Sequence, residues 1–192
     1  EQLDHSYPIP QHICEYTYDL IQNDKLRFNK AENDYRTVTF HDSCNVARGS
    51  RMGDWAGGQF DIPRAVIKAA CNNYVDMDPD TIKESTFCCG GGGGILTDDL
   101  MEVRVKGALP RMEALNDVVK EDGVTHLAAI CAICKAQFAK ILPYYKFPMD
   151  MIVSTHQLVG DALVMTGSEQ EKELDGTDEQ EPSAAEKPSD DS

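Results

Sequence analysis

The sequence lacks any long apolar run, and it has few basic residues. No stretch approaches the run of about 18 apolar residues that a membrane-spanning helix needs, so we expect no direct membrane insertion. The pattern of a secretory signal peptide is missing as well.

The 18 Lys and Arg residues stand against 33 Asp and Glu, which gives a formal net charge of −15. Such a surface repels the phosphates of nucleic acids and excludes them as partners.

The acidic excess is uneven along the 192 residues. Residues 166–192 hold ten acidic and two basic residues, a net charge of −8, and this composition predicts a disordered acidic tail. Residues 36–165 have the hydrophobic content of one folded domain. Residues 1–35 are expected to form a helix and a charged linker. Because the sequence begins at Glu1 rather than Met, we interpret it as a piece of a longer protein or a processed form, in which residues 1–35 would close a preceding repeat.

Seven cysteines are present, but their pattern does not fit a disulfide framework. Their number is odd, and Cys88 and Cys89 are adjacent and cannot easily bridge each other. This usage favours a reducing compartment and metal ligation. Cys14 and Cys71 fall inside predicted helices, and we interpret them as small buried thiols of the core.

The centre of the sequence is the pair Cys88-Cys89 followed by the glycine run 90–94. Glycine buries no side chain, so such a run suits a backbone that passes close to a bulky group and offers it N–H donors. A lone Cys-x-x-Cys is a weak signal, but five cysteines with a glycine run and a His-Asp-x-Cys lead-in indicate a metal–sulfur centre. The other cysteines of the pattern are separated from the pair by 43 residues on the N-terminal side and 41 on the C-terminal side: Cys44, and Cys131 with Cys134.

The hydrophobic pattern predicts an α/β fold with a parallel sheet and helices on both faces. Cys44 and Cys131 each follow the end of a predicted strand, where functional residues of parallel sheets gather. Cys134 lies one helical turn after Cys131, so both thiols can reach one centre. The predicted strands are 37–40, 74–77, 124–130 and 150–153. The predicted helices are 10–23, one starting at 63, 97–121 with a break or kink at Gly107 and Pro110, 131–143, and 156–165.

The loop 46–59 has two interpretations that the sequence leaves open. It contains Arg48, Arg51 and Trp55 and is rich in glycine. It is either a surface excursion with Trp55 as a packing anchor, or a lid beside the centre whose arginines meet an anionic partner.

On these residues, the sequence resembles the cysteine-rich CCG domain of heterodisulfide reductase B- and D-type subunits and of glycolate-oxidase-type iron–sulfur subunits. The run CCGGGGGILTD at residues 88–98 is most similar to the K-type subunits of the membrane complex linked to dissimilatory sulfite reductase. The resemblance covers about residues 36–165. Both gaps between the cysteines are somewhat wider than in the commonest members.

The resemblance implies a cofactor and roles for the residues of the motif. In that family, five cysteines imply a noncubane [4Fe-4S] cluster at which a disulfide is reductively split. Gly90 and Gly91 would contact this cluster through their N–H groups. His41 would act as a hydrogen-bonding neighbour or, less favoured, as a proton donor to a leaving thiolate. The implied ligands, which would also be the catalytic residues, are Cys44, Cys88, Cys89, Cys131 and Cys134.

The resemblance also implies partners and a place in the cell. A membrane-embedded, quinone-interacting subunit and other iron–sulfur subunits would exchange electrons with the chain. A small sulfur-carrier protein would present the disulfide or trisulfide. The chain would then be cytoplasmic and peripheral on the inner face of the cell membrane.

Two other functions compete with disulfide reduction. The first is an electron-relay subunit of a glycolate- or lactate-oxidase-type complex. The second is a zinc-stabilised assembly module without redox chemistry. Structural zinc and an ordinary cubane cluster each take four protein ligands, so a set of five cysteines favours the disulfide-reducing function.

Overall fold

The computed structural model describes residues 10–52, 55–56 and 59–175, and its centre is a three-stranded parallel sheet. The strand order is β1–β4–β5, with Phe40 opposite Ala128 and Ala128 opposite Val153. Strand β1 is buried along its whole length and β4 along its last three residues, as expected of a parallel sheet covered on both faces. Their bounds are β1 (Val38–His41), β4 (His126–Ala129) and β5 (Ile152–Ser154).

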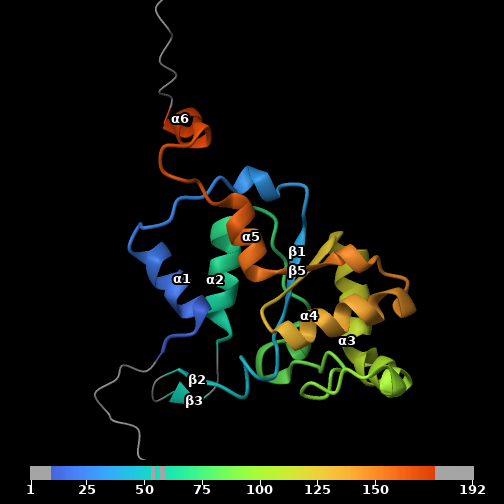
Figure 1. The fold of residues 1–192 in the computed structure, drawn as a ribbon. Coiled ribbons are helices and arrows are strands. Elements are labelled where there is room, and N and C mark those ends of the chain that lie inside the picture. Colours follow the sequence, from blue (N-terminus) through green and yellow to red (C-terminus); the bar gives the residue numbers. More distant parts are fainter. Residues whose placement is uncertain (1–9, 53–54, 57–58, 176–192) are drawn as a thin grey trace, which may run out of the picture.

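Helices cover both faces of this sheet (Figure 1). Helices α1, α2 and α5 pack together on one face, and α3 and α4 lie on the other. The predicted α/β fold is therefore confirmed. The helices are α1 (Ile13–Gln22), α2 (Asp61–Ala70), α3 (Met101–Asp122), α4 (Ala132–Ile141), α5 (Thr155–Ala162) and α6 (Glu169–Asp175), and a small antiparallel pair is formed by β2 (Arg51–Met52) and β3 (Trp55–Ala56).

The predicted strand 74–77 is wrong. Tyr74 makes a single parallel bridge to Val38, at the edge of the sheet opposite β5. The chain then turns away, because Asp76 accepts a hydrogen bond from Arg64 and Pro79 opens a 3-10 turn. An aspartate held by a buried arginine and a proline without an N–H donor leave no regular ladder to extend.

Helix α3 runs through Gly107 and Pro110 without the predicted break. Pro110 lies on the exposed face, so the carbonyl that it leaves without a partner can meet water. The helix begins later than predicted, at Met101, after a 3-10 turn over Asp98–Leu100. Gly123 ends it with a φ of +68°, in the left-handed region where glycine costs least.

The ends of the chain differ from the predictions in detail. Helix α1 begins at Ile13 rather than at residue 10, because His12 caps it and Glu15 completes a capping box. The acidic segment opens with the short helix α6, which the sequence did not predict. The predicted tail beyond residue 175 and the first nine residues of the predicted N-terminal segment 1–35 lie outside the described residues. No helix in the described part of the chain is long and apolar enough to cross a membrane.

Candidate metal centre

The ends of two neighbouring strands and one loop bring the cysteine motif together. Strand β1 ends at His41, three residues before Cys44, and β4 ends two residues before Cys131. Because β1 and β4 are parallel neighbours, these ends lie at the same edge of the sheet. The loop between α2 and α3 carries Cys88 and Cys89 to this edge.

Three side chains form the buried heart of the site. The ligand atoms of His41, Cys89 and Cys134 lie within 4.8 Å of one another, and all three residues are buried. Cys134 lies in the first turn of α4, whose N-terminal end favours negative charge. The His41 ring packs edge-on against Phe138 of the same helix, with a centroid distance of 4.9 Å. His41 and the two thiols thus form a donor set that fits a soft metal ion or a metal–sulfur cluster.

The thiols form a hydrogen-bonded chain toward the surface. Cys88 bonds Cys89, and Cys89 bonds Cys134. The bond to Cys134 raises the pKa of Cys89 to about 12, and the bond to Cys89, with burial, raises the pKa of Cys88. A raised pKa favours the protonated thiols of Cys88 and Cys89, so metal binding at these two residues should release protons.

The other two cysteines of the motif lie outside this row of three thiols. Cys131 is the N-cap of α4 and packs against the same core cluster as Cys89. Cys44 is half-buried, and its thiol faces Asn45 Oδ1 at 3.9 Å. The membership of all five cysteines in one ligand set remains a prediction.

The glycine run lies against the sulfur atoms. The Gly90 N–H donates to Cys88 Sγ at 3.3 Å, and the N–H groups of Gly91 and Gly92 bond Cys89 and Cys88 respectively. Gly90 has a φ of +84° and lies directly against α3, where a Cβ would collide with the carbonyl oxygen of Arg104. The backbone can follow this path only because the residue has no side chain.

His41 is buried as a neutral ring. Burial, and then the charge of Arg111, hold its pKa well below the ordinary value of 6.5. Burial thus favours the neutral ring over the imidazolium form. The Nδ1 atom has no hydrogen-bond partner within the described residues, so it is free to face a ligand in the site.

The anchor of the cysteine loop was not predicted from the sequence. The buried carboxylate of Asp42 accepts two hydrogen bonds of 2.7 Å from Arg64 and one of 2.9 Å from the Lys83 N–H. The Asp42 carbonyl accepts from Thr86 Oγ1 at 3.0 Å. Asp42, the residue that follows β1, thus fixes the position of the loop that leads to Cys88. The sequence offered one signal for this anchor, which was the presence of Arg64 among the apolar residues of α2.

We expect Asp42→Asn to destabilise the metal-free protein by about 2 kcal/mol, because it weakens charge-assisted hydrogen bonds to a buried guanidinium. Urea unfolding followed by circular dichroism measures the loss. The matched control is Asp161→Asn, which removes the carboxylate that pairs with Arg36 but is 39% exposed. The control should cost less than about 1 kcal/mol. Equal losses in both variants would contradict the anchoring role of Asp42.

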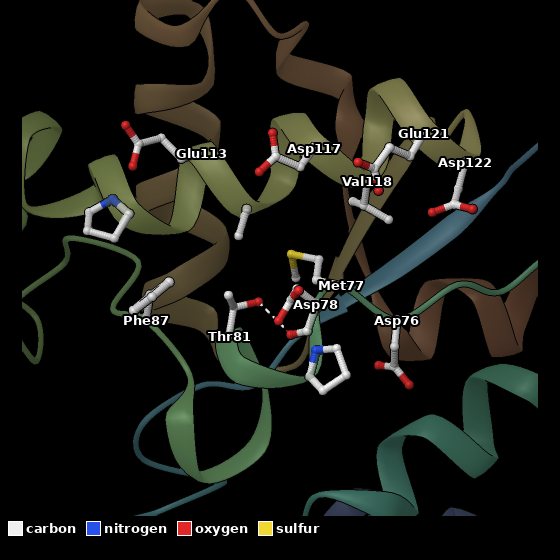
Figure 2. Close-up of a pocket in the computed structure, with 13 residues that line it drawn as sticks. Asp76, Met77, Asp78, Thr81, Phe87, Glu113, Asp117, Val118, Glu121 and Asp122 are labelled. Atoms are coloured by element: carbon white, nitrogen blue, oxygen red, sulfur yellow. Dashed lines mark hydrogen bonds between the residues drawn. The ribbon is translucent and has the colours of Figure 1, made fainter.

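A separate pocket of about 510 Å³ opens between α3 and the loop before the cysteine pair (Figure 2). Phe87, next to Cys88 in the chain, lies at its edge, but no cysteine is among the described residues that line it. The carboxylates along its wall make this pocket negative, which disfavours anionic small molecules. Its carboxylates are Asp76, Asp78, Glu113, Asp117, Glu121 and Asp122.

The remaining predicted residues fall as follows. Cys14 and Cys71 are buried in the core, as predicted, and burial raises their pKa values to about 12 and about 11.

In the loop 46–59, Arg48 donates to the carbonyl of Glu84 at 3.4 Å, which ties this loop to the segment before the cysteine pair.

Comparison with known proteins places this motif in a family. The model of the cysteine-rich CCG domain matches residues 38–139, the span that carries all five motif cysteines. The chain belongs to the CCG cysteine-rich domain family. No solved structure matches it.

Several curated relatives share this domain. The "Hdr-like menaquinol oxidoreductase iron-sulfur subunit 2" of Archaeoglobus fulgidus is 44% identical over 155 residues, which cover 81% of this chain and 26% of the relative. The D-type subunit of the dihydromethanophenazine:CoB–CoM heterodisulfide reductase of Methanosarcina mazei is 33% identical over 160 residues, which cover 79% and 33%. A "probable membrane-anchored ferredoxin" of Chromohalobacter salexigens is 29% identical over 73% of this chain and 18% of the relative. The chain thus spans between about a sixth and a third of these relatives.

Proposed function

We propose that this chain is the cluster-binding domain of a heterodisulfide-reductase-like iron–sulfur subunit whose electrons are linked to the quinone pool. The observation that carries the proposal is the meeting of His41, Cys89 and Cys134, with glycine N–H groups on the neighbouring sulfur atoms. Relatives named as menaquinol oxidoreductase and heterodisulfide reductase subunits support it.

The cofactor in this proposal is a noncubane [4Fe-4S] cluster. Gly90 and Gly91 would donate N–H bonds to its sulfur atoms, and His41 would face it from the buried side. When bound, the cluster supplies single electrons and iron sites for sulfur. Its ligands would be Cys44, Cys88, Cys89, Cys131 and Cys134.

The substrate in this proposal is a disulfide or trisulfide, presented by a small sulfur-carrier protein. Cys88 supports this, because it is exposed while Cys89 and Cys134 are buried. The site is therefore open on the side of Cys88 and closed toward α4, so a bulky partner can approach from one direction. A membrane-embedded quinone-interacting subunit and other iron–sulfur subunits would complete the complex, on the inner face of the cell membrane.

Metal analysis of the anaerobically purified chain tests this proposal. We expect about four irons and matching acid-labile sulfide per chain, as a [4Fe-4S] cluster requires. Zinc is measured in the same samples. One zinc without iron would replace the redox proposal with the structural zinc module.

A further inference from the structure

Arg111 of α3 is a fully buried cation whose hydrogen-bond acceptors are all neutral. Its Nη2 donates to Thr86 Oγ1 at 3.0 Å and to the carbonyl of Thr81, and its Nη1 donates to Met77 Sδ at 2.9 Å. Its Nε has no hydrogen-bond partner within the described residues. The carboxylate of Asp42 attracts it, but Asp42 makes its ion pair with Arg64. A buried charge without an opposite charge is strongly unfavourable.

Arg104 of the same helix is also buried, and its charge is only weakly neutralised. It is 2% exposed, and its Nε donates to Gln137 Oε1 at 2.8 Å. Its nearest carboxylate, Asp98, lies 3.8 Å away, is 77% exposed and bonds Lys140 more closely, at 2.6 Å. Its Nη2 has no hydrogen-bond partner within the described residues. Water screens such an exposed carboxylate, so most of the positive charge of Arg104 remains.

Both arginines lie on the face of α3 that meets the cysteine pair. Residues 104, 108 and 111 follow one another at helical spacing, so they share one face. A Cβ on Gly90 would touch both the carbonyl of Arg104 and, at 3.0 Å, the Cβ of Ala108. Thr86, which accepts from Arg111, precedes Cys88 by two residues.

The third buried arginine of this region is different. Arg64 of α2 is neutralised by two carboxylates, Asp42 and Asp76, at 2.7 and 2.8 Å. The fold therefore neutralises Arg64, the buried arginine that anchors the cysteine loop through Asp42, with carboxylates. Arg111 has only the attraction of Asp42, whose carboxylate is already paired with Arg64, and Arg104 has only an exposed carboxylate. The positive charge that remains on both arginines suits a negatively charged group bound at the cysteines.

We propose that Arg104 and Arg111 are the buried counter-charges of the thiolate-bound cluster and raise its reduction potential. This inference rests on the proposed function, because it requires a redox-active metal centre at the cysteines. Reduction adds one negative charge to a group that five thiolates already make anionic. Two cations in a protein interior of low dielectric favour the reduced form over the oxidised form.

Redox titration of the iron-loaded chain, followed by EPR, tests this role. We expect Arg111→Gln to shift the midpoint potential to a more negative value and Arg111→Lys to stay close to the wild type, because lysine keeps the charge. Arg104→Gln should shift the potential in the same direction, and it carries the test if Arg111→Gln does not fold. The matched control is Arg36→Gln, which removes a buried arginine that is paired with Asp161 beside α5.

The outcomes separate this inference from the proposed function. If the two Gln variants at 104 and 111 keep the wild-type potential, or shift it no more than Arg36→Gln does, the inference is overturned while the iron–sulfur function stands. The same holds if Arg111→Lys shifts the potential as much as Arg111→Gln, because the effect would then arise from packing. If the wild-type chain contains no iron, both proposals are overturned together.

Discussion

Cys89→Ser is expected to remove nearly all iron from the protein. Cys89 is the buried thiol that contacts both Cys88 and Cys134, and its sulfur lies within 4.8 Å of the His41 ring nitrogen. Serine is close in size, but its hydroxyl stays protonated and is a hard ligand, whereas iron–sulfur clusters select soft thiolates. Iron and sulfide per chain, measured after anaerobic purification, report the loss.

Cys71→Ser is the matched control for this result. Cys71 is equally buried, but it lies at the end of α2 in the core on the other face of the sheet. The control should keep the wild-type iron content, although a buried hydroxyl lowers its stability. Equal iron in Cys89→Ser and the wild type would contradict a cluster held by Cys89, and so would an equal loss in both variants.

The second large effect is expected from Gly90→Ala, which should destabilise even the metal-free protein by about 3 kcal/mol or more. A φ of +84° alone costs an alanine about 1 to 2 kcal/mol, and overpacking adds about 1 to 3 kcal/mol. The added Cβ would collide with the carbonyl oxygen of Arg104 and lie 2.9 Å from Gln137 Nε2. A backbone oxygen in a helix cannot move aside cheaply. Urea unfolding of the metal-free variant measures this loss.

Gly93→Ala separates backbone strain from collision. Gly93 also has a positive φ, of +74°, but a Cβ there would meet nothing within 4 Å. We therefore expect this control to cost only about 1 kcal/mol. If Gly90→Ala were no worse than Gly93→Ala, the close approach of the CCG turn to α3 would not be a feature of the folded protein.

Much of the site could be predicted because its residues have strong local signals. Strands β1 and β4 lie in short stretches rich in β-branched or apolar residues, and parallel neighbours place the residues after them at one edge. The glycine run likewise predicted a backbone that reaches sulfur atoms through its N–H groups, and the Gly90 N–H lies at Cys88 Sγ. Periodicity and residue chemistry suffice for such features.

The parts that could not be predicted depend on contacts between distant residues. The apolar residues Val75 and Met77 predicted a strand, but Asp76 is held by Arg64 from α2, and this pairing cannot be read from local sequence. Arg111 lies in a helix with many charged residues, where an exposed position is the usual expectation. Its burial follows only from how α3 packs behind the cysteine loop.

EPR of the oxidised, iron-loaded chain, with and without a small thiol and a disulfide, is the decisive test of disulfide chemistry at the cysteine site. We expect a paramagnetic signal of the oxidised protein that changes when the thiol or disulfide is added, because the exposed Cys88 side leaves the cluster open to a substrate sulfur. The Cys71→Ser control should give the same change. A signal that appears only on reduction, has the form of an ordinary cubane and ignores both additions would contradict disulfide chemistry and favour an electron relay.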